Sequence, residues 1–307
     1  MKAKEQYLKT IQKLHVYHRG ERRAPHKPLL LLLAISKLLE GDKQIAFPEI
    51  EASLIPLLEA YAPSVKARHQ PELPYWHLQS DGLWIVEGAD LLPLQAGGFP
   101  RMQGLRDTRG FLDSQFAKFL TSDHSFRGAV VSSLLEGYFP KTRHEDILEA
   151  VNLPLPQSNK VSDLAAMYTA RKARDPGFSI QVLRAYEHKC AVSGFRAALA
   201  GRYFGCEAAH IQWHAYDGPD IVENGLALEP TIHKLFDAGA WSLTDDRRVI
   251  VSAEFTGSDE TIKRIRALHG VTIRAPLNGQ PEVSKEFIRW HREPRLGAVF
   301  RLPALPL

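Results

Sequence analysis

Four polar residues recur at set intervals in the segment CEAAHIQWHAYDGPDIVENGLALEPTIHKLFDAG, which covers residues 206–239. They are His210, Asn224, His233 and Asp237. The apolar residues that end at His210 predict a strand, the Asp-Gly-Pro sequence after them predicts a loop, and residues 229–238 have the pattern of a helix. His233 and Asp237 are four apart, so on a helix they share a face. An imidazole and a carboxylate on one face can bind a divalent cation.

The order and spacing of these residues resemble the HNH nuclease family, whose core is the ββα-metal finger. The likeness covers about residues 190–246 and includes CAVSG, AAHI, NGL and HKLFDAG. It implies that His210 is the general base, a role that suits neutral imidazole near pH 7. It also implies that His233 and Asp237 bind the metal. Asn224 either orients His210 or approaches the metal.

The positions around the base histidine leave the metal shell open. Many HNH enzymes carry an Asp or His ligand immediately before the base, and this chain has Ala209 there. The shell is then sparse, filled by water, or completed by a group such as Glu207. Oxygen-rich ligation with one imidazole favours Mg²⁺ or Mn²⁺ over structural zinc. His214 and Asp217, in the intervening loop, are expected to face solvent or DNA.

The length, net charge, cysteine content and apolar runs of the chain limit the classes of protein to which it can belong. The chain has 307 residues, which is enough for two domains, and its net charge of +4 permits a polyanionic partner without proving one. Its two cysteines, Cys190 and Cys206, cannot make a disulfide framework or a four-thiolate zinc site, so we expect buried thiols in a reducing cytoplasm. The longest apolar run, Leu29–Ile35, has seven residues. Because a membrane span needs about 20, the run predicts a buried helix and no membrane partner.

The first half of the chain is expected to be mainly helical. Patterns over residues 2–17, 28–40 and 111–151, and after Pro48, predict helices, and Pro28 suits a first helical position. The exception is PYWHLQSDGLWIV, where aromatic and β-branched residues flank an Asp-Gly pair. This pattern predicts a small hairpin, with Trp76 and Trp84 in its core.

The proline-containing segment NLPLPQSNKVSD divides the chain. We predict a first domain over residues 1–152, a linker over 153–164 and an HNH domain over 165–307. The fold class is therefore α+β, with a mainly helical N-terminal domain that has a small hairpin. The C-terminal domain is a ββα-metal core with added helices.

A basic segment precedes the most apolar helix. Its cations are Arg22, Arg23, His26 and Lys27. Helix N-termini carry free N–H groups and partial positive charge, so these residues predict a cradle for the DNA backbone. The alternative is a solvated basic loop.

Two stretches, APHKPLLLLLAI and LPYWHLQSDGLW, resemble the sulfur-binding domain of phosphorothioation-dependent type IV restriction endonucleases. The likeness covers about residues 1–150, and an HNH core follows that domain in the family. The resemblance implies double-stranded DNA in which sulfur replaces a non-bridging phosphate oxygen. Sulfur is more polarisable and less hydrated than oxygen, so a shallow apolar pocket rimmed by cations can prefer it.

The resemblance also implies the residues that make this pocket. The candidates are Leu73, Pro74, Tyr75 and His77. Arg101 follows a Gly-Gly-Phe-Pro turn and is the candidate for a further DNA contact, with Arg106 and Arg109 as competitors.

The whole chain is therefore interpreted as a cytoplasmic type IV restriction endonuclease. One site per chain has to cut two strands, which favours a homodimer. Two alternatives stay open. One is an HNH enzyme that reads methylated bases in an aromatic cage, for which Tyr75 and Trp76 are candidates. The other is a DNA-binding protein whose HNH core is inactive because of Ala209.

Overall fold

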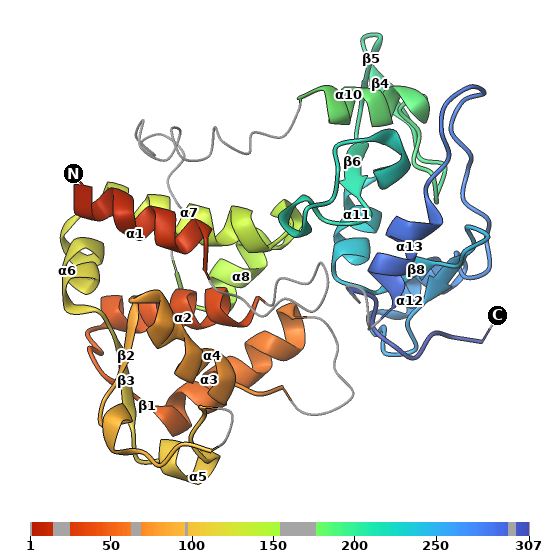
Figure 1. The fold of residues 1–307 in the computed structure, drawn as a ribbon. Helices are drawn as coiled ribbons and strands as arrows, with labels where there is room; N and C mark the ends of the chain where they lie inside the picture. The colour runs from red at the N-terminus through yellow and green to blue at the C-terminus, as the bar shows by residue number, and fades with distance from the viewer. Residues whose placement is uncertain are drawn as a thin grey trace. The chain divides into compact units, whose positions relative to one another are not determined.

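The computed structural model describes residues 2–14, 25–62, 69–95, 98–153, 176–293 and 299–306 (Figure 1). These residues form two compact units, the first ending at residue 153 and the second beginning at residue 176. Arg22, Arg23 and residues 154–164 of the predicted linker lie outside the described residues. Within the described ranges, no helix has both the length and the apolar character needed to cross a membrane.

The first unit is built mainly from helices (Figure 1). They are α1 (Lys2–Gln12), α2 (His26–Glu40), α3 (Phe47–Tyr61), α4 (Glu72–His77), α5 (Met102–Leu105), α6 (Ser114–Ser122), α7 (His124–Tyr138) and α8 (His144–Ala150). Three short 3-10 turns join them: η1 (Leu78–Asp81), η2 (Ala89–Leu91) and η3 (Lys141–Arg143). The helices predicted in this half are confirmed, although the first ends earlier than expected.

Helix α2 is the centre of the first unit. Every residue of Leu29–Ile35 is buried, so the helix is apolar on all sides. It packs against α3, α4, α6 and α7. Pro28 is the third residue of the helix rather than the first. It still lies in the first turn, where N–H groups make no hydrogen bond within the helix, so the N–H that proline lacks is not needed. Gly41 ends the helix with a φ of 108° and donates its N–H to the carbonyl of Leu38.

The predicted hairpin is wrong, because α4 and η1 occupy its first half. Pro74 lies in the first turn of α4, where proline is tolerated, whereas in a strand it would remove a ladder hydrogen bond. Gly82 ends η1 with a φ of 69° instead of turning a hairpin. The sheet has the order β1 (Ile45–Ala46), β3 (Arg109–Leu112), β2 (Trp84–Val86), and both pairings are antiparallel. The predicted α+β class is confirmed.

The second unit combines short two-stranded ribbons with helices (Figure 1). Its helices are α10 (Pro176–Ala185), α11 (Pro230–Asp237), α12 (Asp259–Arg266) and α13 (Lys285–Arg292). Its antiparallel ribbons are β4 (Ala197–Leu199) with β5 (Arg202–Phe204), β6 (Glu207–His210) with β7 (Gly225–Leu228), and β8 (Trp241–Leu243) with β9 (Val249–Val251). Two turns, η5 (His214–Tyr216) and η6 (Val222–Asn224), lie between β6 and β7. Helix α10 packs on β6 and β7, and α11 contacts β6 and β8.

We predict that Gly110→Ala destabilises the first unit. An added Cβ would lie 2.1 Å from Cζ2 of Trp84 and 2.7 Å from Cε2 of Tyr75, and both rings are buried. Overpacking of this kind lowers the free energy of unfolding by about 1–3 kcal/mol. The matched control is Gly128→Ala in α7, where a Cβ has no atom within 4 Å. It should raise stability by about 0.5–1 kcal/mol. Urea unfolding of both variants measures the two effects, and equal stabilities would contradict this packing.

Candidate functional site

His210 ends β6 and is fixed by a ring and a carboxylate. Its imidazole stacks on Phe178 of α10, with ring centroids 3.9 Å apart and planes 17° apart. Its Nε2 lies 2.7 Å from Oδ1 of Asp220. An ionised carboxylate only accepts hydrogen bonds, so Nε2 carries the proton and the lone pair of the neutral ring is on Nδ1. That tautomer is the one that a base acting through Nδ1 requires.

His214 lies beside the same carboxylate. Its Nδ1 is 3.4 Å from Oδ1 of Asp220. One ligand atom each from His210, His214 and Asp220 lies within 4.8 Å of the other two. Sequence reasoning did not select Asp220 and expected His214 to face solvent or DNA. An acidic residue ten positions after a histidine gives no signal of the contact, because it depends on the fold of the loop.

His233 lies on α11 between two carboxylates. Its Nδ1 is 2.7 Å from Oε2 of Glu207, and its Nε2 is 3.3 Å from Oδ2 of Asp237. The Asp237 side chain is 2% exposed and the Glu207 side chain is 50% exposed. The predicted pairing of His233 with Asp237 on one helix face is present. Glu207, named from the sequence as one way to complete the shell, also reaches the ring.

The donor set around His233 suits a divalent cation. A neutral imidazole has one N–H, so it can donate a hydrogen bond to only one of its two neighbouring carboxylates. At the other nitrogen, a lone pair faces an anionic carboxylate, and this contact is repulsive. A cation bound between the two would make the contact attractive. Two carboxylates and one imidazole are ligands that Mg²⁺ and Mn²⁺ accept. Because Glu207 is the exposed carboxylate, its side of the ring is the one open to solvent.

Asn224, in η6, has a different role from the one expected of a metal ligand. The residue is completely buried. Its Oδ1 accepts a hydrogen bond from the backbone N–H of Gln212 at 2.8 Å, and its Nδ2 donates to the carbonyls of Gln212 and Pro219, both at 3.0 Å. The side chain therefore closes the loop that follows His210. The contacts correct its predicted approach to the metal, because both ends of the amide are used by the backbone.

Helix α13 supports the helix that carries His233. His291 is completely buried, and its ring stacks on Phe236 of α11 with centroids 3.8 Å apart. Its Nε2 donates to the carbonyl of Phe236 at 3.2 Å, and its Nδ1 lies 2.9 Å from the Ser242 hydroxyl. This neutral ring joins α11, α13 and β8.

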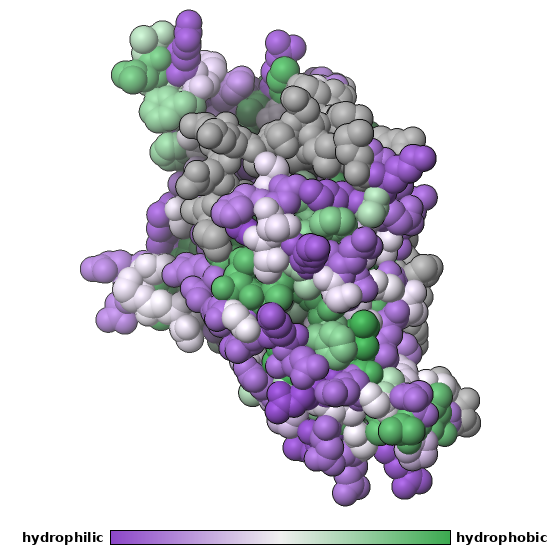
Figure 2. Space-filling view, turned by 90° about the vertical axis from the view of Figure 1, so that its left-hand side faces the viewer, coloured by the Kyte–Doolittle hydropathy of each residue, from purple (hydrophilic) through white to green (hydrophobic). Residues whose placement is uncertain are grey.

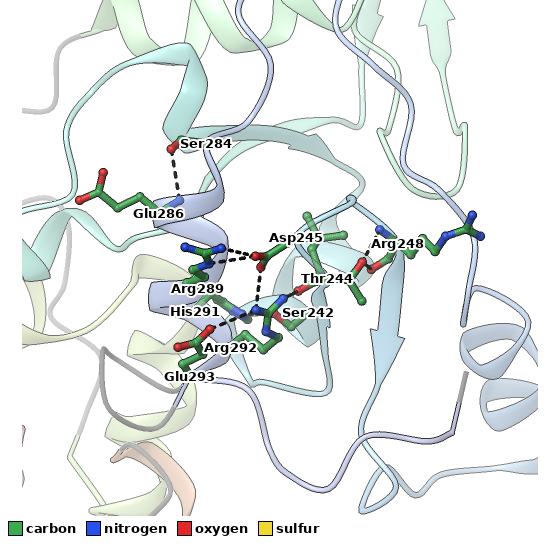
Figure 3. Close-up of polar contacts among 11 residues, drawn as sticks. Ser242, Thr244, Asp245, Arg248, Ser284, Glu286, Arg289, His291, Arg292 and Glu293 are labelled. Atoms are coloured by element: carbon green, nitrogen blue, oxygen red, sulfur yellow. Dashed lines mark hydrogen bonds and ion pairs between the residues drawn. The ribbon is translucent and has the colours of Figure 1, made fainter.

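A second set of contacts ties α13 to the end of β8. Figure 3 shows Arg289 and Arg292 converging on the carboxylate of Asp245, at 2.9 Å and 2.7 Å. The hydrogen bonds from the two guanidinium groups lower the pKa of Asp245 to about 2. These contacts give the basic face of α13 a structural role.

The predicted phosphate cradle in the first unit needs correction. Lys27 is 6% exposed, and its Nζ lies 2.6 Å from Oδ2 of the buried Asp81. Its charge is therefore matched inside the protein rather than presented at the surface. Burial, together with the nearby His69, lowers the pKa of His26 to about 4, so His26 is neutral at pH 7. The two residues line the start of α2 without forming an exposed cationic pair.

The candidates for the sulfur pocket separate into core and surface residues. Tyr75 is fully buried, packs on Phe47 and Trp84, and shares a hydrogen bond with Thr108, so its side chain is part of the core. Pro74 is buried as well. Leu73 is 37% exposed and His77 is exposed. The remaining surface candidates are Leu73, His77 and Arg101, together with the competitors of Arg101, Arg106 and Arg109, which are also exposed.

Two aromatic predictions for this region can also be compared with the structure. Trp84 is in the core as predicted, whereas Trp76 is only partly buried and lies edge-on to Phe99.

Arg101 is the exposed residue before α5. Figure 2 shows hydrophilic residues over most of the face in view, with small hydrophobic areas between them.

Two known families match separate parts of the chain. Residues 4–155 match the family described as "ScoMcrA-like, DNA sulfur-binding domain", and residues 190–244 match the family described as "HNH endonuclease". The second match contains β6, β7 and α11, with His210, Asn224, His233 and Asp237. No curated protein matches the chain. The predicted resemblance, in which a sulfur-binding domain is followed by an HNH domain, is confirmed.

Solved structures also include similar chains. The sulfur binding domain of ScoMcrA complexed with phosphorothioated DNA is 24% identical, covers 48% of this chain and 94% of that one, and has a TM-score of 0.41. For the sulfur binding domain of SprMcrA complexed with phosphorothioated DNA, the values are 22%, 49%, 94% and 0.40. For the type IV phosphorothioation-dependent restriction endonuclease ScoMcrA, they are 14%, 74%, 93% and 0.35.

We predict that His291 makes the second unit sensitive to acid. Burial lowers the pKa of His291 from 6.5 to about 3, against the opposing effect of its hydrogen bond to Phe236. The unfolded chain therefore takes up a proton below pH 6.5 that the folded chain does not. Stability is fully present above pH 6.5 and falls as the pH drops towards 3. The loss between pH 7 and pH 5 is about 2 kcal/mol.

The variant that tests this is His291→Gln, which keeps a donor but does not titrate. It should be less stable than the unaltered protein at pH 7, yet lose less stability between pH 7 and pH 5. Urea unfolding followed by tryptophan fluorescence gives both values. An identical pH slope in the two proteins would show that the acid sensitivity has another source.

Proposed function

We propose that this chain, a nuclease that joins a ScoMcrA-like DNA sulfur-binding domain to an HNH endonuclease domain, is a type IV restriction endonuclease. Its first unit would bind double-stranded DNA that carries a phosphorothioate. Its second unit would hydrolyse the backbone nearby with one divalent cation and a histidine base. The observation that carries the proposal is the ββα unit, in which β6 holds His210 beside Asp220 and α11 holds His233 between two carboxylates.

Glu207 and His233 would hold the cation, with Oε2 and Nδ1 2.7 Å apart on the solvent-open side of the ring. Asp237 would fix the orientation of the ring by accepting from Nε2, as carboxylates beside metal-bound histidines commonly do. When bound, a divalent cation polarises the scissile phosphate and stabilises the departing 3′ oxygen. Mg²⁺ and Mn²⁺ remain the predicted ions.

His210 would act as the base through Nδ1, because Asp220 holds the proton on Nε2. The stack on Phe178 prevents the ring from turning away. As His210 takes a proton from water, the carboxylate beside Nε2 stabilises the imidazolium that forms. Asp220 is therefore a positioning residue that acts through the base.

The first unit would supply recognition through α4 and the segment before α5. Leu73 offers an exposed apolar surface and Arg101 an exposed cation. His77 lies one turn after Leu73 on α4, and partial burial and the nearby Lys27 lower its pKa, so its ring is neutral at pH 7. An apolar and a neutral group suit a poorly hydrated sulfur better than a fully hydrated oxygen, and a cation suits the remaining charge of the phosphate.

The alternative of a methylated-base reader is less well supported. Tyr75 belongs to the core, and Trp76 donates its indole N–H to the carbonyl of Gly98 at 3.2 Å. These two rings therefore do not form the aromatic cage that a flipped base would enter. The homodimer and the cytoplasmic location stay predictions.

The proposal predicts selective treatment of sulfur-bearing DNA. Two duplexes of one sequence, with and without a single Rp phosphorothioate, are incubated with the protein in Mg²⁺ and then in Mn²⁺, and both binding and cleavage are measured. Only the sulfur duplex should be cut, and it should bind more tightly. Equal treatment of both duplexes would leave the HNH chemistry in place and remove sulfur recognition.

The same assay compares the contributions of two exposed apolar residues of the first unit, Leu73 and Ile85, to the preference for the sulfur duplex. Leu73→Ser should weaken the preference for the sulfur duplex about tenfold, the value of roughly 1.4 kcal/mol of apolar contact. Ile85→Ser is the matched control, because Ile85 is 39% exposed and lies on β2 rather than α4.

We also predict that the base and its positioning residue can be separated from DNA binding. His210→Ala should abolish cleavage and keep DNA binding. Asp220→Asn should lower kcat by about 10²–10⁴-fold, because the amide can stabilise the wrong tautomer. Single-turnover cleavage and a binding titration measure both effects. Loss of DNA binding in folded His210→Ala, or an unchanged kcat in Asp220→Asn, would contradict these roles.

A further inference from the structure

We propose that His210, His214 and Asp220 form a second metal site that takes Zn²⁺ and, by taking it, switches off the base. The site is distinct from the cation site at Glu207 and His233, since the two lie on opposite faces of β6. The inhibition rests on the proposed nuclease function, whereas zinc binding does not.

The distances from Asp220 to the two histidines are close to those between ligands of a zinc site. In tetrahedral zinc sites the ligands lie about 2.0–2.2 Å from the metal, which places them about 3.3 Å from one another. Nδ1 of His214 is already 3.4 Å from Oδ1 of Asp220. Nε2 of His210 is 2.7 Å from that oxygen, a hydrogen-bond distance that opens once a metal displaces the proton.

The environment of the His214 ring nitrogens gives a second reason to expect a ligand. Both of its ring nitrogens are shielded from solvent, and neither has a hydrogen-bond partner within the described part of the chain. A buried polar atom without a partner is destabilising, by about 1–3 kcal/mol for an ordinary group. A metal bound at Nδ1 would remove that penalty.

The donor set selects zinc over the cations of catalysis. Imidazole and carboxylate groups are typical ligands of zinc. Mg²⁺ and Mn²⁺ prefer oxygen donors, and the site at Glu207 and His233 has one imidazole where this site has two. Because their ligands differ, one site would bind Zn²⁺ and the other Mg²⁺ or Mn²⁺.

Zinc would inhibit by changing the tautomer of His210. In the ring held by Asp220, the proton is on Nε2 and the lone pair on Nδ1. A metal on Nε2 needs the lone pair there, so the single proton of the neutral ring moves to Nδ1. A ring protonated on Nδ1 cannot take a proton from water at that atom. Catalysis stops although the cation at Glu207 and His233 is unaffected.

The test compares zinc binding and zinc inhibition in matched variants. His214→Phe removes one ligand, and His188→Phe is the control in the same unit, since His188 stacks on Tyr203 away from the three residues. Zinc affinity is measured by competition with a chromophoric chelator, and geometry by the absorption of bound Co²⁺. His214→Phe should bind zinc at least about 100-fold more weakly, because even the loss of a residue behind a metal ligand weakens binding by 10–100-fold.

Cleavage in Mg²⁺ is then titrated with Zn²⁺. Zinc should inhibit the unaltered protein and His188→Phe alike. His214→Phe should keep the Mg²⁺-dependent activity and need about 100-fold more zinc for half inhibition. His214→Gln serves as a second variant if the phenylalanine disturbs the fold.

Three results would overturn the proposal. In the first, His214→Phe and His214→Gln bind zinc as tightly as the unaltered protein. In the second, the chelator titration shows zinc binding lost in His233→Ala and kept in the His214 variants, which would place zinc at the catalytic cation site. In the third, zinc bound through His214 accelerates cleavage. If no cation supports cleavage at all, the nuclease proposal fails, and the chelator titration still decides whether the zinc site exists.

Discussion

The pairing of β6 with β7 is the constraint on which the site in the second unit depends. Side chains alternate across a strand, so Glu207 faces α11 and reaches His233, whereas His210 faces α10 and stacks on Phe178. In the observed register His210 lies opposite Gly225. A slip of one residue would send each side chain to the other face and exchange the positions of base and ligand.

Asn224, the last residue of η6, and Gly225, the first residue of β7, hold that register. Asn224 binds the backbone of the loop on both sides of its amide, so the chain after His210 can follow only one path. At Gly225 a Cβ would lie 2.3 Å from Cγ2 of Val182, so glycine lets α10 approach the ribbon closely. Two residues without a chemical role thereby place the base against its stacking partner.

The sequence predicted features that depend on local patterns better than features that depend on contacts between distant segments. The apolar run gave α2, and the spacing of His233 and Asp237 gave the face of α11, because both depend on helix periodicity. The contact of Asp220 with His210 was missed because it depends on how the loop folds back. Lys27 was expected at the surface because a cation before a helix usually is exposed. Only the packing of η1 against α2 shows that a buried Asp81 neutralises it.

Among the contacts of the described residues, carboxylates are placed differently around the two histidines of the site. His210 faces Asp220 through one nitrogen, so one proton satisfies that contact and the lone pair stays on the other nitrogen. His233 faces a carboxylate through each nitrogen, and one proton cannot satisfy both. A ring with one carboxylate is prepared to accept a proton, and a ring with two is prepared to share a cation. The base and the metal ligand are both histidines, and the fold gives them different roles through the carboxylates that it places beside each ring.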